Sequence, residues 1–350
     1  MIFRTMTPPA LRATSPRLRT GRKEGVVTLK TNLLRALALV LLAVAGPAFA
    51  QGAYPNKQVR IVVPFPAGGS ADVLCRIVGE KLSAAWSQPV IVDNRAGAGG
   101  NVGAEIAYRA EPDGYTLLCS PPPPLAINHN LYKTLPYDWT KFAPIAVLAI
   151  VPNVISARFD LPASSLKELI AYAKANPGKV TYASQGNGST SHLSAQMLAT
   201  MAGIEMVHVP YKGEGPALVD LTAGRIDIFI GNISAALRFE KAKQAKFHGL
   251  ASRTRSPVAP DVPTTAELGL PDLIAITWFA FVAPPGTPDA IVQKVNIDIA
   301  AALKLPDVRS RFLDLGAEPQ GGTTAATASF IKEEEVRWRL VIRSANVTLE

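Results

Sequence analysis

The chain has 350 residues, 48% of them hydrophobic, and a formal net charge of +9. Residues 1–50 hold eight Lys and Arg side chains against one acidic side chain, so they carry +7 and leave +2 for the rest. A charge this small gives no electrostatic support for binding nucleic acid, and we expect no such partner. The remaining residues, roughly 300, suffice for one large lobe or two medium lobes with proper cores.

Residues 1–50 have the pattern of a basic extension followed by a secretory signal peptide. An apolar run from Leu33 to Ala45 follows the basic stretch, and Ala48 and Ala50 form a small-x-small cleavage site. The run is shorter than the roughly 18 residues of a membrane span, so a transmembrane anchor is the weaker alternative. No cysteine stands at the cleavage point to carry a lipid. We therefore expect cleavage near Ala50 and a periplasmic location.

Beyond this leader, short β-branched runs alternate with patterns of helical spacing. The first unit has predicted strands at 59–63, 90–92 and 115–119 and predicted helices at 72–86 and 102–109. A long apolar stretch at 142–155 follows, broken by two prolines. It is too long for one ordinary strand and too rich in proline for a helix, so we interpret it as a crossover between two lobes.

A second alternating unit follows the crossover. Its predicted elements are helices at 165–175, 190–201, 216–223 and 235–243, and strands at 179–183, 206–209, 226–230 and 247–251. Proline-rich residues 256–271 are interpreted as a linker, and a strand at 277–283 returns the chain to the first unit. The remaining predicted helices lie at 288–303, 306–315 and 324–345.

These elements predict an α/β fold in which parallel sheets are covered by helices and two lobes are joined by two crossings. Residues 51–150 and 276–350 form the predicted lobe 1, and residues 151–275 form lobe 2. Ligands of open α/β sheets bind outside the carboxyl ends of the strands. We therefore expect a ligand in the cleft between the lobes.

The two cysteines lie in a predicted helix (Cys75) and at a predicted strand end (Cys119). An oxidising periplasm permits a disulfide, but the sequence does not show that their Cα atoms come close enough. We favour two unpaired buried thiols and keep the disulfide as the alternative. Neither cysteine has the spacing of a metal ligand with any of the four histidines, so we expect no metal site and no cofactor.

Two glycine-containing loops each join a predicted strand to a helix, at residues 65–72 and 184–192. The free N–H groups of a helix start and the helix dipole favour a carboxylate or phosphate, and glycine lets a ligand approach the backbone. For either loop alone, an ordinary capped turn is the alternative. One such loop in each lobe favours an anion site. Residues 97–101 and 186–191 lack essential positions of nucleotide-binding motifs.

Catalysis has little support in this sequence. His192 follows several serines, but there is no Gly-x-Ser-x-Gly motif and no acid that we can place beside it, so we predict no catalytic residue. His192 is either a donor near the cleft or a structural histidine. Lys212 is more often solvated than a ligand contact at such a position, and Trp278 and Phe279 suit hinge packing somewhat better than a cleft wall.

Seven motifs in order resemble the tripartite tricarboxylate transporter receptor family, the Bug proteins. They lie at residues 54–69, 94–101, 112–118, 135–138, 186–188, 208–213 and 316–319. The resemblance covers nearly all of residues 54–350. It implies a type II periplasmic-binding-protein fold and a receptor that delivers a small carboxylate solute to one large and one small membrane subunit. We expect a monomer without enzymatic activity; the alternatives are a sensor for a signalling kinase or, less favoured, a hydrolase.

The resemblance also implies that the two loops hold a carboxylate from opposite lobes, partly through ordered water. The predicted ligand-binding residues are Phe65, Pro66, Gly68, Gly69, Ser70, Asp72, Ser120, Asn128, Ser184, Gly186, Asn187, Gly188, Ser189, Thr190, His192 and Asn232. The chain departs from the family pattern at Pro121 to Pro124, which replace a small polar loop, and at Gly231, which stands where an acid is usual. Both departures favour a less polar ligand, such as an aromatic or short-chain carboxylate.

Overall fold

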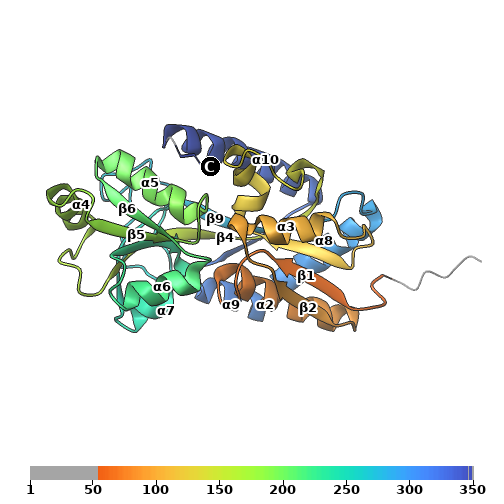
Figure 1. The fold of residues 1–350 in the computed structure, drawn as a ribbon. Coiled ribbons are helices and arrows are strands. Elements are labelled where there is room, and N and C mark those ends of the chain that lie inside the picture. The colour runs from red at the N-terminus through yellow and green to blue at the C-terminus, as the bar shows by residue number, and fades with distance from the viewer. Residues whose placement is uncertain (1–53, 346, 349–350) are drawn as a thin grey trace, which may run out of the picture. The chain divides into compact units, whose positions relative to one another are not determined.

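The structure is a computed structural model that describes residues 54–345, 347 and 348. The predicted leader lies outside these residues. Within them, no helix combines the length and apolar character that crossing a membrane requires. The described chain forms one ten-stranded sheet with helices packed on it (Figure 1).

The strands follow the order β2-β1-β3-β9-β4-β7-β5-β6, and β8 and β10 also pair with β4. Their bounds are β1 Val59–Val63, β2 Val90–Asn94, β3 Thr116–Ser120, β4 Ala143–Arg158, β5 Val180–Ser184, β6 Met206–Pro210, β7 Ile228–Asn232, β8 Ala245–Leu250, β9 Ile276–Ala283 and β10 Glu318–Gly321. Pairing is parallel within β1–β3 and within β5–β7, as predicted, but antiparallel wherever β4 or β9 takes part. We call β1–β3, β9 and β10, with the loops and helices that connect them, the first strand group, and β5–β8, with their connecting loops and helices, the second.

The helices alternate with these strands close to the predicted positions. Their bounds are α2 Ser70–Trp86, α3 Asn101–Tyr108, α4 Leu166–Ala175, α5 Thr190–Ala202, α6 Glu214–Thr222, α7 Ile233–Lys241, α8 Asp289–Lys304, α9 Pro306–Asp314 and α10 Thr324–Ser344. Short helical turns lie at Ala98–Gly100, Pro123–Ile127, Asn128–Asn130 and Trp139–Lys141. In Figure 1, α3, α5 and α10 lie on one side of the strands and α2, α6, α7 and α9 on the other.

The predicted crossover at 142–155 is a single strand of 16 residues, β4. Its first part pairs with β9 as far as Pro152, and from Asn153 onward it pairs with β7 and β8. The judgement that this stretch was too long for one strand was wrong, because β4 belongs to both strand groups. The pairing with β9 shifts register after Pro144, as expected where proline lacks an N–H donor. The proposed division into lobes stays a prediction.

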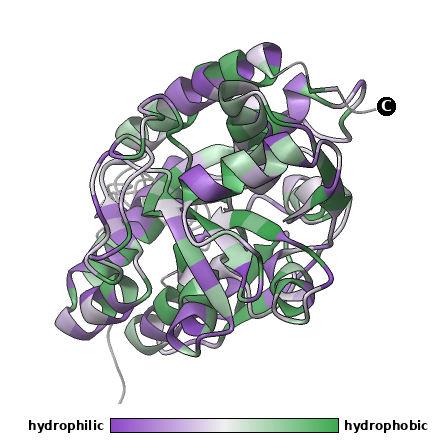
Figure 2. Ribbon diagram, turned by 90° about the vertical axis from the view of Figure 1, so that its left-hand side faces the viewer, coloured by the Kyte–Doolittle hydropathy of each residue, from purple (hydrophilic) through white to green (hydrophobic). Residues whose placement is uncertain are grey.

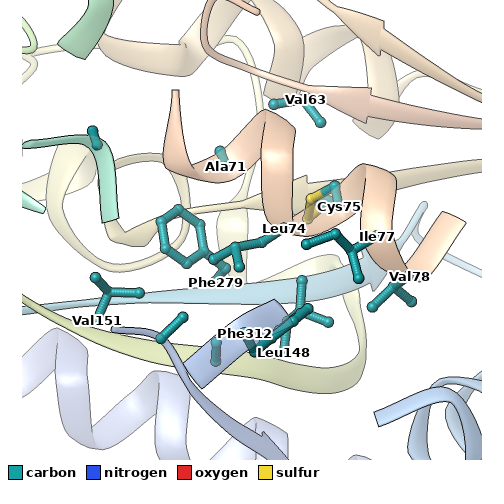
Figure 3. Close-up of a cluster of buried hydrophobic side chains, with 14 of the residues drawn as sticks. Val63, Ala71, Leu74, Cys75, Ile77, Val78, Leu148, Val151, Phe279 and Phe312 are labelled. Atoms are coloured by element: carbon teal, nitrogen blue, oxygen red, sulfur yellow. A yellow bond between two sulfur atoms is a disulfide. The ribbon is translucent and has the colours of Figure 1, made fainter. Parts of the chain in front are cut away.

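The buried core connects α2 and α9 to the strands. Leu74 on α2 packs in one cluster with Leu148 on β4, Phe279 on β9 and Phe312 on α9, all at most 1% exposed (Figure 3). Burying a side chain of this size contributes about 1.5–3 kcal/mol relative to leaving it exposed. Apolar residues accordingly dominate the central strands in Figure 2, while polar segments recur along the outer helices.

Cys75 on α2 and Cys119 on β3 form a disulfide, so the interpretation of two unpaired thiols was wrong. Their Cα atoms lie 6.6 Å apart, within the range that a disulfide spans. The proximity arises because α2 folds back over the strands and turns Cys75 toward β3, a contact between distant residues that local patterns do not reveal. Both cysteines are fully buried.

Candidate functional site

The loop between β1 and α2 is held by Asp72, in the first turn of the helix. One carboxylate oxygen of Asp72 accepts a hydrogen bond from the Gly68 N–H at 2.9 Å, and the other accepts one from Arg76 Nε at 2.8 Å. Burial alone would raise the pKa of Asp72, but the hydrogen bonds from Arg76 and Gly68 lower it below its usual value. Asp72 therefore organises the loop, and its carboxylate already has partners within the chain.

The loop between β5 and α5 is organised by its own hydroxyl groups. Ser189 caps α5 by accepting from the His192 N–H at 3.3 Å, and its hydroxyl donates to the Gly186 carbonyl at 2.7 Å. The Ser184 hydroxyl accepts from the Gly186 N–H and is hydrogen-bonded to His208 Nε2 at 2.7 Å. These serines stabilise the turn, and their hydroxyls are largely engaged there.

His192 belongs to a stack of aromatic rings. Its ring lies 4.1 Å from that of His208, at an interplanar angle of 6°, and His208 stacks in turn on Tyr182 at 4.8 Å. His192 Nδ1 accepts a hydrogen bond from the Gly188 N–H at 3.2 Å. Burial lowers the pKa of both histidines to about 4, so both are neutral near pH 7. This geometry favours the structural interpretation of His192.

Glu214, the first residue of α6, connects the two loops. Its Oε2 accepts hydrogen bonds from the Ser70 N–H at 2.7 Å and the Ser70 hydroxyl at 2.8 Å, and its Oε1 accepts one from Gln185 Nε2 at 2.9 Å. The side chain is buried, and burial raises its pKa against the opposing effect of hydrogen bonds from Ser70 and Asn232. A carboxylate thus occupies the start of α2, where the helix dipole favours negative charge.

A cavity of about 20 Å³ adjoins this carboxylate between the two strand groups. That volume holds about one water molecule. Its lining residues are Phe65, Pro66, Gly69, Ser70, Ala71, Pro121, Gln185, Glu214, Gly215, Asn232 and Phe279. The side-chain oxygen of Asn232 is buried and has no hydrogen-bond partner among the described residues.

Five of the predicted ligand-binding residues line this cavity: Phe65, Pro66, Gly69, Ser70 and Asn232. Gly68 lines a neighbouring pocket. Other predicted polar side chains bond within the chain. Ser120 donates to the Pro121 carbonyl, Asn128 donates to Asn101 at 2.6 Å, and Thr190 is hydrogen-bonded to Thr277 at 2.9 Å. The backbone carbonyl of Asn187 approaches Gly99, so it faces the glycine-rich turn of the first strand group.

Gln185 and Glu214 were absent from the predicted set, although both are central to the observed cavity. Helix α6 was expected to begin at Pro216, but it begins two residues earlier. An acidic residue just after Gly213 is a usual signal for a helix start, and it could have identified Glu214. Lys212 is exposed, and Phe279 both packs in the core cluster and lines the cavity.

Gly231 was expected to deprive the site of an acidic group. A Cβ atom at Gly231 would overlap the ring of Phe229, which explains why glycine suits this position. The expected loss of an acidic group at this position stays a prediction, and the cavity lining also includes Glu214 from another element. In the part of the chain that the structure describes, no cluster of three His, Cys, Asp or Glu side chains could hold a metal ion.

Comparisons with solved structures identify the fold. The chain matches Rpa4515 of R. palustris, solved with adipate, at a TM-score of 0.83 and 36% identity, over 84% of this chain and 99% of that one. It matches the periplasmic binding protein BugD at a TM-score of 0.82 and 33% identity, over 85% of this chain and 100% of BugD. It also matches MatC of Rhodopseudomonas palustris, solved with bound malate, at a TM-score of 0.79 and 34% identity, over 83% of this chain and 100% of MatC. These matches confirm the predicted α/β periplasmic-binding-protein fold.

Sequence comparisons agree with the structural ones. BugT of Bordetella pertussis is 38% identical over 325 residues, which cover 91% of this chain and 100% of BugT. Residues 74–347 match the sequence model of the tripartite tricarboxylate transporter family receptor. The members of this family are solute-binding receptors and not enzymes, in agreement with the absence of a predicted catalytic residue. The chain belongs to the tripartite tricarboxylate transporter receptor family.

Proposed function

We propose that this receptor captures a small carboxylate in the cavity between the two strand groups. The observation that carries the proposal is the pair of hydrogen bonds that Ser70 makes at the start of α2. Its N–H and hydroxyl already hold a carboxylate, that of Glu214, at 2.7 and 2.8 Å. The same two donors, together with the helix dipole, suit one carboxylate group of a ligand.

The relatives support this class of ligand. Rpa4515 was solved with adipate and MatC with malate, both of them small dicarboxylates. The lining of the present cavity is partly apolar, with Phe65, Pro121 and Phe279 on its walls. We therefore propose a carboxylate whose remainder is largely apolar, such as a dicarboxylate with a methylene chain or an aromatic acid.

Entry of such a ligand requires the two strand groups to separate. A volume of about 20 Å³ accommodates roughly one water molecule, far less than a dicarboxylate of six carbons. The strands β4 and β9 lie side by side where the chain passes between the groups, with Pro152 opposite Ile276. We propose that the predicted lobes move about this pair of strands, as hinged domains do around ligands.

We further propose that the protein acts in the periplasm, as a monomer, and passes its solute to one large and one small membrane subunit. Family membership supports the delivery role, and the predicted signal peptide supports export. The Cys75–Cys119 disulfide also suits an oxidising compartment, because cytosolic thiols are normally kept reduced.

The test is a thermal-shift measurement on the mature protein, unfolded and refolded to remove any ligand carried through purification. The panel includes adipate, malate, citrate and benzoate. We expect at least one of these to raise the melting temperature, because a ligand that binds the folded state stabilises it. A flat response to the whole panel, together with native mass spectra free of any bound solute, contradicts the proposal.

A further inference from the structure

The position of Glu214 is unusual for a site that takes up anions. The side chain is 7% exposed and lies between the Ser70 and Gln185 side chains, one from each strand group. Both of its carboxylate oxygens already accept hydrogen bonds, three in total from these two residues. The Ser70 N–H, the Ser70 hydroxyl and the Gln185 amide are therefore engaged by a group of the chain itself.

The cavity nevertheless retains hydrogen-bonding capacity that the chain does not use. The side-chain oxygen of Asn232 is buried, lines the same cavity and has no partner among the described residues. A buried acceptor without a partner destabilises the folded state. Its presence indicates that this cavity is shaped to hold a further polar group, and an acceptor of this kind suits a hydroxyl, an N–H group or a water molecule.

The backbone around Glu214 holds its carboxylate at this position. The preceding residue, Gly213, has φ of +147°, and a Cβ atom there would lie 2.8 Å from Pro66 Cδ. The start of α6 is thus packed closely against the loop that leads to α2. In addition, the Ser234 hydroxyl donates to the Ser70 hydroxyl at 2.6 Å, which leaves the Ser70 hydrogen free to point at Glu214.

A ligand carboxylate at the start of α2 would meet the Glu214 carboxylate directly. Both groups would accept from the same Ser70 N–H, and two negative charges about 3 Å apart repel each other so strongly that they do not both stay ionised. A ligand anion and the Glu214 carboxylate therefore compete for one set of donors.

We infer that Glu214 competes with the ligand carboxylate for the Ser70 and Gln185 donors and thereby limits the affinity of the site for carboxylates. A ligand binds only by displacing the Glu214 side chain, so Glu214 lowers the affinity for all carboxylates and excludes the weaker ones. This inference rests on the proposed carboxylate-binding function. The alternative is that Glu214 raises the affinity, because its carboxylate binds an ammonium or hydroxyl group of the ligand.

The experiment is isothermal titration of adipate and malate into the mature protein and three variants. Glu214→Gln keeps the size of the side chain and removes its charge, and Glu214→Ala removes the competing group altogether. Glu205→Gln is the matched control, because Glu205 is exposed and lies in the same strand group. We expect both Glu214 variants to bind at least one dicarboxylate about tenfold or more tightly than the wild type, and Glu205→Gln to bind it within about twofold of the wild type.

Two outcomes overturn the inference alone. One is an affinity that the Glu214 variants leave unchanged. The other is weaker binding by these variants, which would mean that Glu214 itself binds the ligand. If the wild type and both Glu214 variants fail to bind either dicarboxylate, the proposed function fails for this ligand class and the inference fails with it. A thermal melt of each variant, taken before titration, establishes that it is folded.

Discussion

Ser70 and Glu214 are 144 residues apart in sequence, yet two hydrogen bonds join them across the cavity. Ser70 contributes the N–H and the hydroxyl, and Glu214 accepts both with one oxygen. This contact connects the start of α2 in the first strand group with the start of α6 in the second. In the proposed function, this contact couples the binding of a carboxylate to the relative position of the two strand groups.

Replacing Ser70 by alanine removes one of the two donors and keeps the backbone N–H. The loss of a hydrogen bond to a charged group reduces binding by about 1.5–3 kcal/mol, so we expect carboxylate affinity to fall at least tenfold. Titration of a carboxylate that binds the wild type measures this change. Ser164→Ala, at an exposed serine, is the control and should match the wild type. Equal affinity in the two alanine variants would place the ligand away from Ser70.

Pro121 favours less polar ligands in the proposed site. It lines the cavity and provides an apolar wall without an N–H group. Pro121→Ser adds a hydroxyl donor to this wall, so we expect the affinity ratio of malate to adipate to rise by about threefold or more. Competition titrations with the two acids measure the ratio. An unchanged ratio would mean that the ligand does not contact this wall.

The disulfide should stabilise the fold. It closes a loop of 44 residues, for which the chain-entropy estimate is about 4 kcal/mol. We expect the double variant Cys75→Ala and Cys119→Ala to lose about 2–4 kcal/mol of unfolding free energy in urea while carboxylate affinity stays within about twofold. A thiol assay on the denatured, unreduced wild type checks the pairing itself. Two reactive thiols in that assay would contradict it.

Two buried histidines and the half-buried His208 predict a pH dependence of stability. Burial lowers the pKa of His192, His208 and His248 to about 4 each, whereas an unfolded histidine titrates near 6.5. Between these values the unfolded chain binds more protons, so the free energy of unfolding decreases as pH falls from 6.5 to 4. The decrease is on the order of 1–2 kcal/mol for each histidine by pH 5. Carboxylates with a lowered pKa, such as Asp72, lose their contribution only below about pH 4.

Urea unfolding at pH 7, 6 and 5 measures this dependence. His248→Gln should make the free energy of unfolding depend less steeply on pH. Its effect is informative because neither ring nitrogen of His248 has a hydrogen-bond partner among the described residues. A wild-type free energy of unfolding that stays constant across this range would contradict the proposed neutral state of the three histidine rings.

Local patterns were sufficient to predict most of the elements. The alternation of β-branched runs with helical spacing located strands such as β1 and β5 to within a residue, and the two loops that precede α2 and α5 were identified from their glycines and hydroxyl groups. The short strand β10, Glu318–Gly321, was missed. It has only four residues, and it forms because the chain after α9 pairs with β4, which no local pattern encodes.

The errors concern contacts between distant residues. The length of β4 was misjudged because one strand serves two groups, and the disulfide was not favoured because the packing of α2 on β3 brings Cys75 to Cys119. Glu214 was missed for a different reason. Its helix was expected to begin at Pro216, so the acid was assigned to a loop and its approach to Ser70 was not considered. The sequence therefore predicted one half of the central contact, the donors at α2, and missed the acceptor.

The most direct test of the central claim is a crystal structure of the mature protein with a bound carboxylate from the panel. We predict that a ligand carboxylate accepts hydrogen bonds from the N–H and hydroxyl of Ser70, and that the Glu214 side chain has moved away from both. A ligand bound elsewhere, or one bound while Glu214 still accepts from Ser70, would contradict it.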